Sequence, residues 1–344
     1  MGPTLRRVTV SLLTLGAFAT FASPAGASHV ATRTDTDRVR SAIGYLATQQ
    51  KANGSIPAFS PLGSTSDAVL AIVAAGTGKP QLRRALDYLH RQVKNAKANT
   101  IGLQAKVVAA VVAAGRNPRT FAGTNLIRSI RATLHTNGRF GDATVFDDAL
   151  AMIALEAAGA TVPSNTTQWL LDAQCPDGGW QYDQPASAGE DVHCLSTTDP
   201  TNDFFQSDTN TTSYVVQAIE AAGGGSFTQD PFAFFTAIRD DVHRGWGYSW
   251  GVETTDANST ALVIQAYAAA GVTLSSGAMN ALRSLQDPSC GGWSFTWVDD
   301  QSGSHPDDPN PGATIGAVLG ILQQPLPVPA GVVHAHLPVT PSCG

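Results

Sequence analysis

The chain has 344 residues, of which 14% are charged, and a formal net charge of -6. With so few basic residues, the composition offers no basic stripe for nucleic acid, and binding to an anionic membrane surface loses support for the same reason. The Ala-rich composition instead favours a helical protein made of one large domain or two smaller ones.

The first 27 residues show the features of a secretory signal in their usual order. Arg6 and Arg7 precede an apolar run from Val8 to Ala22, and the small residues Ala25-Gly26-Ala27 follow it. The run is shorter than the roughly 20 residues that a membrane-spanning helix needs, and no later stretch is long and apolar enough to span. We therefore expect cleavage after Ala27, a secreted mature protein, and a short linker over residues 28–35.

Internal repeats dominate the rest of the sequence. Most of the repeated segments open with Ser, Thr or Asp, which can cap a helix, and stop at Gly, which can end one. Each is apolar almost all round, so we expect it to be a buried inner helix. The six segments are STSDAVLAIVAAG (64–76), LQAKVVAAVVAAG (103–115), DDALAMIALEAAG (147–159), TTSYVVQAIEAAG (211–223), STALVIQAYAAAG (259–271) and the shorter ATIGAVLGIL (313–322).

A more polar helix is expected ahead of each inner one, with its charged residues on one side. Six outer and six inner helices alternating along the chain predict an all-α fold, an (α/α)6 toroid over residues 36–324, followed by a Pro-rich tail over 325–344. An open superhelix is the alternative, but its terminal repeats would need polar outer faces, which are lacking here. The expected outer helices cover 39–50, 82–93, 126–134, 167–174, 232–241 and 279–286.

Turns marked by glycine and a following apolar or aromatic residue separate the outer from the inner helices. Two of them, within QWLLDAQCPDGGWQYD and SLQDPSCGGWSFTW, resemble the Q-x-x-x-G-G-W repeat of the squalene cyclase and protein prenyltransferase superfamily. The resemblance covers nearly the whole mature chain and implies the toroid. It says little about chemistry, because cobalamin carriers and complement-type thioester domains resemble the same ring.

Four cysteines are expected to form two disulfides in an exported protein. We pair Cys175 with Cys194 across a polar insertion, and Cys290 with Cys343 to hold the tail. A zinc site built from these thiols is disfavoured because none has C-x-x-C spacing.

The N-termini of the inner helices should crowd one mouth of the central cavity, which makes that mouth the expected ligand site. Asp208 with Asn210, and Asp256 with Asn258, resemble the D-x-D-D-T acid motif of class II terpene cyclases, but asparagine stands where the motif has its acid. An amide has no proton acidic enough to start that reaction. We predict these four residues as ligand contacts, and helix capping is the alternative role for the two aspartates.

Asp147 and Asp148 form an adjacent carboxylate pair at the start of an inner helix. If both face an enclosed cavity, burial and mutual repulsion would raise one pKa and provide a catalytic acid. The alternative is that one caps the helix or pairs with an arginine of an outer helix.

Aromatic residues recur with a period of two after the glycine turns. Such spacing in an extended segment points the rings to one side, so we expect a contiguous aromatic wall. We assign Trp180, Trp246 and Trp293 to helix packing. The predicted ligand-stacking residues are Tyr182, Tyr248, Trp250 and Trp297.

No cofactor or metal site is predicted. The inner helices contain no histidine and the chain contains no Cys-Gly-Glu-Gln thioester motif. The acid-rich stretches 175–208 and 299–310 lack the spacing of an EF-hand, so solvated loops are favoured over calcium sites.

The sequence therefore favours a secreted, monomeric protein that binds a small apolar or ring-containing ligand at the toroid mouth, without nucleic acid and without a membrane span. A terpene cyclase or prenyltransferase-like enzyme is the first alternative. A carbohydrate-active toroid enzyme is the second.

Overall fold

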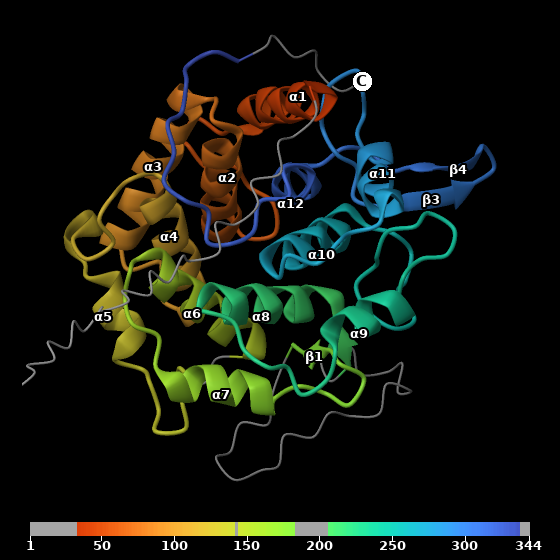
Figure 1. The fold of residues 1–344 in the computed structure, drawn as a ribbon. Helices are drawn as coiled ribbons and strands as arrows, with labels where there is room; N and C mark the ends of the chain where they lie inside the picture. The colour runs from red at the N-terminus through yellow and green to blue at the C-terminus, as the bar shows by residue number, and fades with distance from the viewer. Residues whose placement is uncertain (1–32, 142–143, 183–205, 338–344) are drawn as a thin grey trace, which may run out of the picture.

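The computed structural model describes residues 33–141, 144–182 and 206–337. Within these ranges the chain forms twelve α-helices, one short 3-10 helix and two small two-stranded sheets. The helices alternate between an outer and an inner ring (Figure 1). The outer helices are α1 (Arg33–Gln49), α3 (Lys79–Lys94), α5 (Leu126–Arg131), α7 (Ser164–Asp172), α9 (Pro231–Ala237) and α11 (Ser276–Ser284). The inner helices are α2 (Pro61–Ala75), α4 (Ile101–Ala113), α6 (Val145–Ala157), α8 (Thr209–Ala221), α10 (Ala257–Ala269) and α12 (Pro311–Ile321).

The inner helices close into a ring. Each contacts the next in chain order from α2 to α12, and α12 contacts α2 in turn. Their mostly apolar, Ala-rich sequences are buried on nearly all sides, as expected for helices that pack between an outer layer and their neighbours. The predicted α/α toroid is confirmed, and the open superhelix is not formed.

A repeated hydrogen bond ties each glycine turn to its inner helix. The apolar or aromatic residue one or two positions after the turn glycine donates its backbone N-H to a side-chain oxygen near the start of that helix. The donor and acceptor pairs are Ile56 to Thr65, Phe140 to Asp148, Trp180 to Thr212, Trp246 to Thr260 and Trp293 to Thr314, at 2.8–3.0 Å. Five of the six repeats therefore share one way of fixing the turn at the mouth.

Three tryptophans pack inside their hairpins, in agreement with the packing role expected for them. Trp180, Trp246 and Trp293 are buried, and each indole N-H donates to a backbone carbonyl of the preceding outer-helix segment at 2.6–2.7 Å. The indole thus fills the space between outer and inner helix while its polar atom stays bonded.

Contacts between α11 and α1 close the outer ring. The Arg283 guanidinium binds both carboxylate oxygens of the buried Asp35, at 2.9 and 2.7 Å. Gly291, at a φ of +79°, lies so close to α1 that a Cβ would come within 2.5 Å of Ser41. Only glycine fits this turn without displacing α1.

The segment after α12 crosses the end of the ring at which the inner helices terminate. Leu326 is buried, and its backbone N-H donates to Gln217 Oε1 of α8 at 2.9 Å. Farther along, His334 N-H donates to Gly76 O at 2.9 Å, so the segment is anchored beside the turn between α2 and α3. The Pro-rich tail is thus held against the toroid as far as it is described: the backbone of both of its histidines bonds to the turn after α2, while their side chains are exposed.

The two small sheets lie at the mouth side of the ring. Strand β1 (Trp180–Gln181) pairs with β2 (Ser207–Asp208), and β3 (Trp297–Asp300) pairs with β4 (Gly303–Pro306) in an antiparallel hairpin. No helix among the described residues is long and apolar enough to cross a membrane.

Cys175 and Cys290 are buried, and neither is a free thiol. Their predicted partners Cys194 and Cys343 lie outside the described residues, as do the predicted signal and most of the linker. The pairing therefore stays a prediction.

Candidate functional site

The centre of the toroid contains a cavity of about 220 Å³ that is lined by all six inner helices. Its wall consists of residues one helical turn apart, arranged in three layers. The upper layer, at the helix N-termini, includes Phe146, Asn210, Asn258 and Gly312; the middle layer is Asp67, Lys106, Leu150, Tyr214, Leu262 and Gly316; the lower layer includes Leu70, Ala109, Ile153, Gln265 and Leu319. We call this cavity the lumen.

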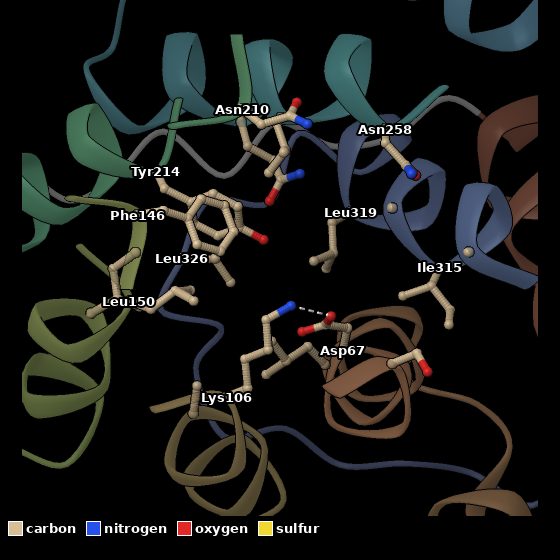
Figure 2. A pocket seen from close by; sticks show the side chains of 18 of the residues that line it. Asp67, Lys106, Phe146, Leu150, Asn210, Tyr214, Asn258, Ile315, Leu319 and Leu326 are labelled. Carbon is tan, nitrogen blue, oxygen red and sulfur yellow. Dashed lines mark hydrogen bonds and ion pairs between the residues drawn. The ribbon is translucent and has the colours of Figure 1, made fainter. Parts of the chain in front are cut away.

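One ion pair lies in the middle layer. Lys106 Nζ of α4 is 2.6 Å from Asp67 Oδ2 of α2, and both side chains are about three-quarters buried (Figure 2). Burial alone would lower the pKa of Lys106, but the charge and hydrogen bond of Asp67 together with the nearby Tyr214 and Asp147 outweigh burial, and the pKa is raised. The ammonium is therefore fixed in its charged form in an otherwise largely apolar wall.

Further polar groups face the lumen from the opposite wall. Tyr214 packs edge to face against Phe146, with ring centroids 4.9 Å apart, and burial raises the pKa of its hydroxyl. Asn210 and Gln265 line the lumen, and the side-chain oxygen of each is buried and accepts no hydrogen bond. Buried acceptors are nearly always satisfied in folded proteins, so these two oxygens are suited to a hydroxyl or N-H group of a ligand.

The rest of the lumen is apolar. Leu326 of the crossing segment lines it at the end where the inner helices terminate, and Leu70 and Leu319 line it from the lower layer. At the mouth Phe59 lines the entrance with 86% of its surface exposed, the largest exposed fraction of any large hydrophobic side chain among the described residues. An exposed aromatic ring at the entrance of an apolar cavity favours entry of an apolar ligand.

Asp147 and Asp148 lie in different surroundings, and they do not both face the lumen as a pair. Asp147 lies against α4, where a Cβ on Gly102 would be 2.1 Å from its Oδ1. Burial raises the pKa of Asp147 and the charge of Lys106 opposes the shift.

Asp148 is fully buried and takes the place that threonine has in the repeated turn hydrogen bond. Burial raises its pKa to about 8, although the Phe140 N-H and the charge of Arg139 lower it. Its Oδ2 accepts no hydrogen bond. The carboxyl is therefore held partly protonated near neutral pH, inside the wall and not at the lumen surface.

The structure places Asp208 and Asp256 as N-caps. Their Oδ1 atoms accept the backbone N-H of Thr211 and of Ser259, each at 2.7 Å. Burial raises the pKa of Asp208 to about 7 and that of Asp256 to about 6. The neighbouring Asn210 and Asn258 line the lumen.

The predicted aromatic set is divided between two places. Tyr182 lies beside the lumen, with its ring 5.6 Å from that of Phe146. Trp250 and Trp297 line a separate groove, in which Trp297 stacks on His243 at 4.5 Å between ring centroids. Tyr248 is half-buried, and its carbonyl accepts the Thr209 N-H at the start of α8.

Sequence reasoning missed Asp67, Lys106 and Tyr214. A signal for them exists: once the inner helices are aligned on their small-residue endings, these three occupy one column, four residues after the column that contains Asn210 and Asn258. Residues four apart share a helix face. Among the described residues no group of three or more histidine, cysteine, aspartate or glutamate side chains could hold a metal ion.

Comparison with known proteins identifies the fold. No family model and no curated protein sequence matches the chain. Solved structures do match it. An α-1,6-mannanase of Salegentibacter sp. matches with a TM-score of 0.54 and 13% identity, over 85% of this chain and 98% of the mannanase. An unsaturated glucuronyl hydrolase of Bacillus sp. (TM-score 0.57, 11% identity) and a type II terpene cyclase of Scytonema (TM-score 0.50, 12% identity) each match over 84% of this chain and 96% of their own.

All three are α/α toroids, and so is this chain. At these identities the likeness establishes the fold alone, and the terpene cyclases are one of several toroid groups that share it. The residues that line the lumen are therefore the basis for a proposed function.

Proposed function

We propose that this protein binds a small, largely apolar molecule in its lumen and does not transform it. The observation that carries the proposal is the make-up of that cavity: an apolar floor closed by Leu326, with polar groups confined to the middle and upper layers. The apolar body of the ligand would lie against Leu319, Leu70 and Leu326. A hydroxyl or amide of the ligand would meet the unsatisfied oxygens of Asn210 and Gln265.

The size of the lumen limits the ligand. At about 220 Å³ it is below the 300–1,000 Å³ usual for drug-sized ligands, so we expect one or two rings, or a short chain, in place of an extended polymer. The absence of catalysis is supported by the state of the charged groups: the Lys106 ammonium is paired with Asp67, and Asp148 is enclosed in the wall.

A filled-lumen variant tests the proposal. Ala109 lines the lower layer, so Ala109→Phe should occupy the space of the ligand. Ala132→Phe adds the same atoms at the exposed end of α5 and serves as the matched control. Native mass spectrometry, with solvent extraction of what co-purifies, and titration with the neutral two-ring fluorophore 2-naphthol should show binding for the wild type and the control, and at least a tenfold loss for Ala109→Phe. Equal binding by all three proteins would refute the proposal.

A carbohydrate-active enzyme is the second candidate, and one observation favours it. Two of the solved structures are mannanase variants described as inactive, in which two consecutive aspartates are replaced, and they hold α-1,6-mannooligosaccharides. This chain has two consecutive aspartates, Asp147 and Asp148, at the start of α6. Glycoside hydrolysis uses a pair of carboxyl groups, one of them with a raised pKa.

Hydrolysis assays decide between the two candidates. Wild type, Asp147→Asn and Asp148→Asn would be incubated with α-1,6-mannan and with an unsaturated glucuronide. Product from the wild type alone would establish the enzyme. A lack of product from all three proteins, together with ligand in the lumen, is what the binding proposal expects.

The cyclase or prenyltransferase-like alternative would also use Asp147 or Asp148 as its acid. A solvent-extracted terpenoid that the wild type converts, and that Asp147→Asn does not, would favour this reading over simple binding.

A further inference from the structure

The expectation that the chain offers no basic stripe, drawn from its small net charge, is wrong, because positive and negative residues are strongly separated along the sequence. Residues 79–139 contain twelve of the 21 lysines and arginines, and Asp87 is the only acidic residue in that stretch. From residue 140 to the end there are three basic residues and 23 acidic ones. One side of the toroid is therefore strongly basic although the whole protein is acidic.

Two of the twelve cations are used inside the fold. Lys106 pairs with Asp67 in the lumen, and Arg139 is buried near Asp148 and over the ring of Trp169. The other ten are exposed: Lys79, Arg83, Arg84, Arg91, Lys94, Lys97, Arg116, Arg119, Arg128 and Arg131. We call these ten residues the basic face.

The basic face is not neutralised by the protein itself. None of its ten side chains takes part in an ion pair within the part of the chain that the structure describes. Where their side chains do form hydrogen bonds, the acceptors are uncharged. Arg84 donates to the Gln50 side chain, and Arg91, Arg119 and Arg131 donate to the backbone carbonyls of Asn53, Ala158 and Thr161. The positive charge is thus available to a partner.

The elements that carry the basic face adjoin one another. Helix α3 contacts the 3-10 helix η1 (Phe121–Gly123), and α5 packs on α4, so α3, η1 and α5 form one side of the ring (Figure 1). From Lys79 to Lys94, α3 alone is about 22 Å long at 1.5 Å per residue. At one end a groove of about 590 Å³ between α3 and the crossing segment is lined by the three cations Lys79, Arg83 and Arg116 and by one anion, Asp87.

We propose that the basic face binds an acidic polysaccharide, a linear sugar chain that carries carboxylate or sulfate groups. This inference goes beyond the lumen and does not depend on what the lumen holds. Seven of the ten cations are arginines, whose planar guanidinium binds carboxylate or sulfate oxygens in pairs. A row of charges along a helix suits an extended chain that carries a charge on successive sugars.

The surroundings of the basic face favour a sugar chain over other polyanions. Single-stranded nucleic acid is usually held by exposed aromatic rings, but Tyr88 of α3 is buried and the ring of Phe121 packs against His90. A lipid surface would need several apolar side chains to insert, and Val332 is the single exposed large hydrophobic side chain at the groove among the described residues. A hydrophilic chain needs neither.

Binding to defined polymers at several salt concentrations tests the proposal. The probes are heparin and alginate as sulfated and carboxylated chains, with neutral dextran, a DNA duplex and vesicles of anionic phospholipid for comparison. We expect binding to heparin, alginate or both that weakens steeply from 50 to 300 mM salt, no binding to dextran, and weaker binding to DNA and vesicles at equal charge concentration.

Two matched double variants distinguish binding by the basic face from a general effect of net charge. Arg83→Gln with Arg116→Gln removes two charges beside the groove, and Arg40→Gln with Arg244→Gln removes two exposed charges elsewhere. Because all four side chains are exposed, we expect unchanged thermal unfolding in both double variants. The first should lose about 3- to 30-fold in affinity for the acidic polysaccharide, and the second less than 2-fold.

Three results would overturn the proposal: no binding to either polysaccharide at 50 mM salt, equal loss in the two double variants, or tighter binding to DNA or vesicles than to the sugar chains. Binding of 2-naphthol to the lumen should be the same in both double variants, so failure of this inference is distinguishable from failure of the lumen proposal.

Discussion

Asp148 shows how a single residue can look catalytic in sequence and have a structural place in the fold. Four other repeats have threonine at its position, and each of those hydroxyls accepts the same turn N-H. Asp148 Oδ1 accepts the Phe140 N-H in the same way. Its second oxygen is buried and accepts no hydrogen bond, and burial of the carboxyl raises its pKa to about 8.

This raised pKa predicts a pH-dependent stability difference. The folded protein holds a proton on Asp148 that the unfolded chain releases near pH 4, so Asp148 lowers the free energy of unfolding as pH rises from about 4 to about 8. Asp148→Asn imitates the protonated carboxyl. Its stability relative to wild type should therefore increase by on the order of 3 kcal/mol between pH 5 and pH 8, measured by urea unfolding. Asp208 and Asp256 titrate in both proteins, so their contributions cancel in the stability difference between variant and wild type. A difference that is constant with pH would contradict the assignment.

At the scale of elements, the inner helices were predictable and the segment that closes the lumen was not. The ending in Ala-Ala-Gly recurs five times at intervals of several tens of residues, and a sixth segment shares the apolar character without the ending. Near-continuous apolar helices can be satisfied only by burial, so the position of the inner helices follows from the sequence. The segment after α12 is rich in proline and has no periodicity. Its position depends on single contacts, such as Leu326 with Gln217, that leave no pattern.

The site was predictable only in part, for a related reason. Asn210 and Asn258 were found because they stand beside capping aspartates in a recognisable motif. Asp67 and Lys106 are an ion pair between two different helices, and neither residue stands out in its own repeat. The aromatic residues were expected to share one wall, but local turns send Tyr182 to the lumen side and Trp250 and Trp297 to a separate groove.

Leu326→Ala tests the role of the crossing segment as the lumen floor. Removing a buried leucine side chain that the neighbouring helices cannot replace should lower the free energy of unfolding by about 2–4 kcal/mol. Val332→Ala, in the same segment but 78% exposed, should change it by less than about 0.5 kcal/mol. Similar small effects from both substitutions in urea unfolding would mean that the segment does not seal the lumen.

At the scale of the whole molecule, the toroid depends on how its ends meet. Arg283 of α11 binds Asp35 of α1 through two hydrogen bonds, and Asp35 is buried, so loss of the arginine removes both hydrogen bonds from a buried carboxylate. Arg283→Gln should cost about 1–3 kcal/mol of stability. Hydrogen–deuterium exchange should rise in α1 and α11 and stay unchanged in α6, on the far side of the ring. Uniform exchange changes in all helices would argue against a local closure contact.

The lumen is the claim on which the functional account depends, and a noble-gas derivative tests it most directly. Apolar cavities inside proteins take up xenon, whereas polar, water-filled ones do not. A crystal of the protein under xenon pressure should show xenon between Leu70, Leu319 and Leu326, below the Asp67–Lys106 pair. A lumen without xenon, filled by ordered water or collapsed side chains, would contradict the account.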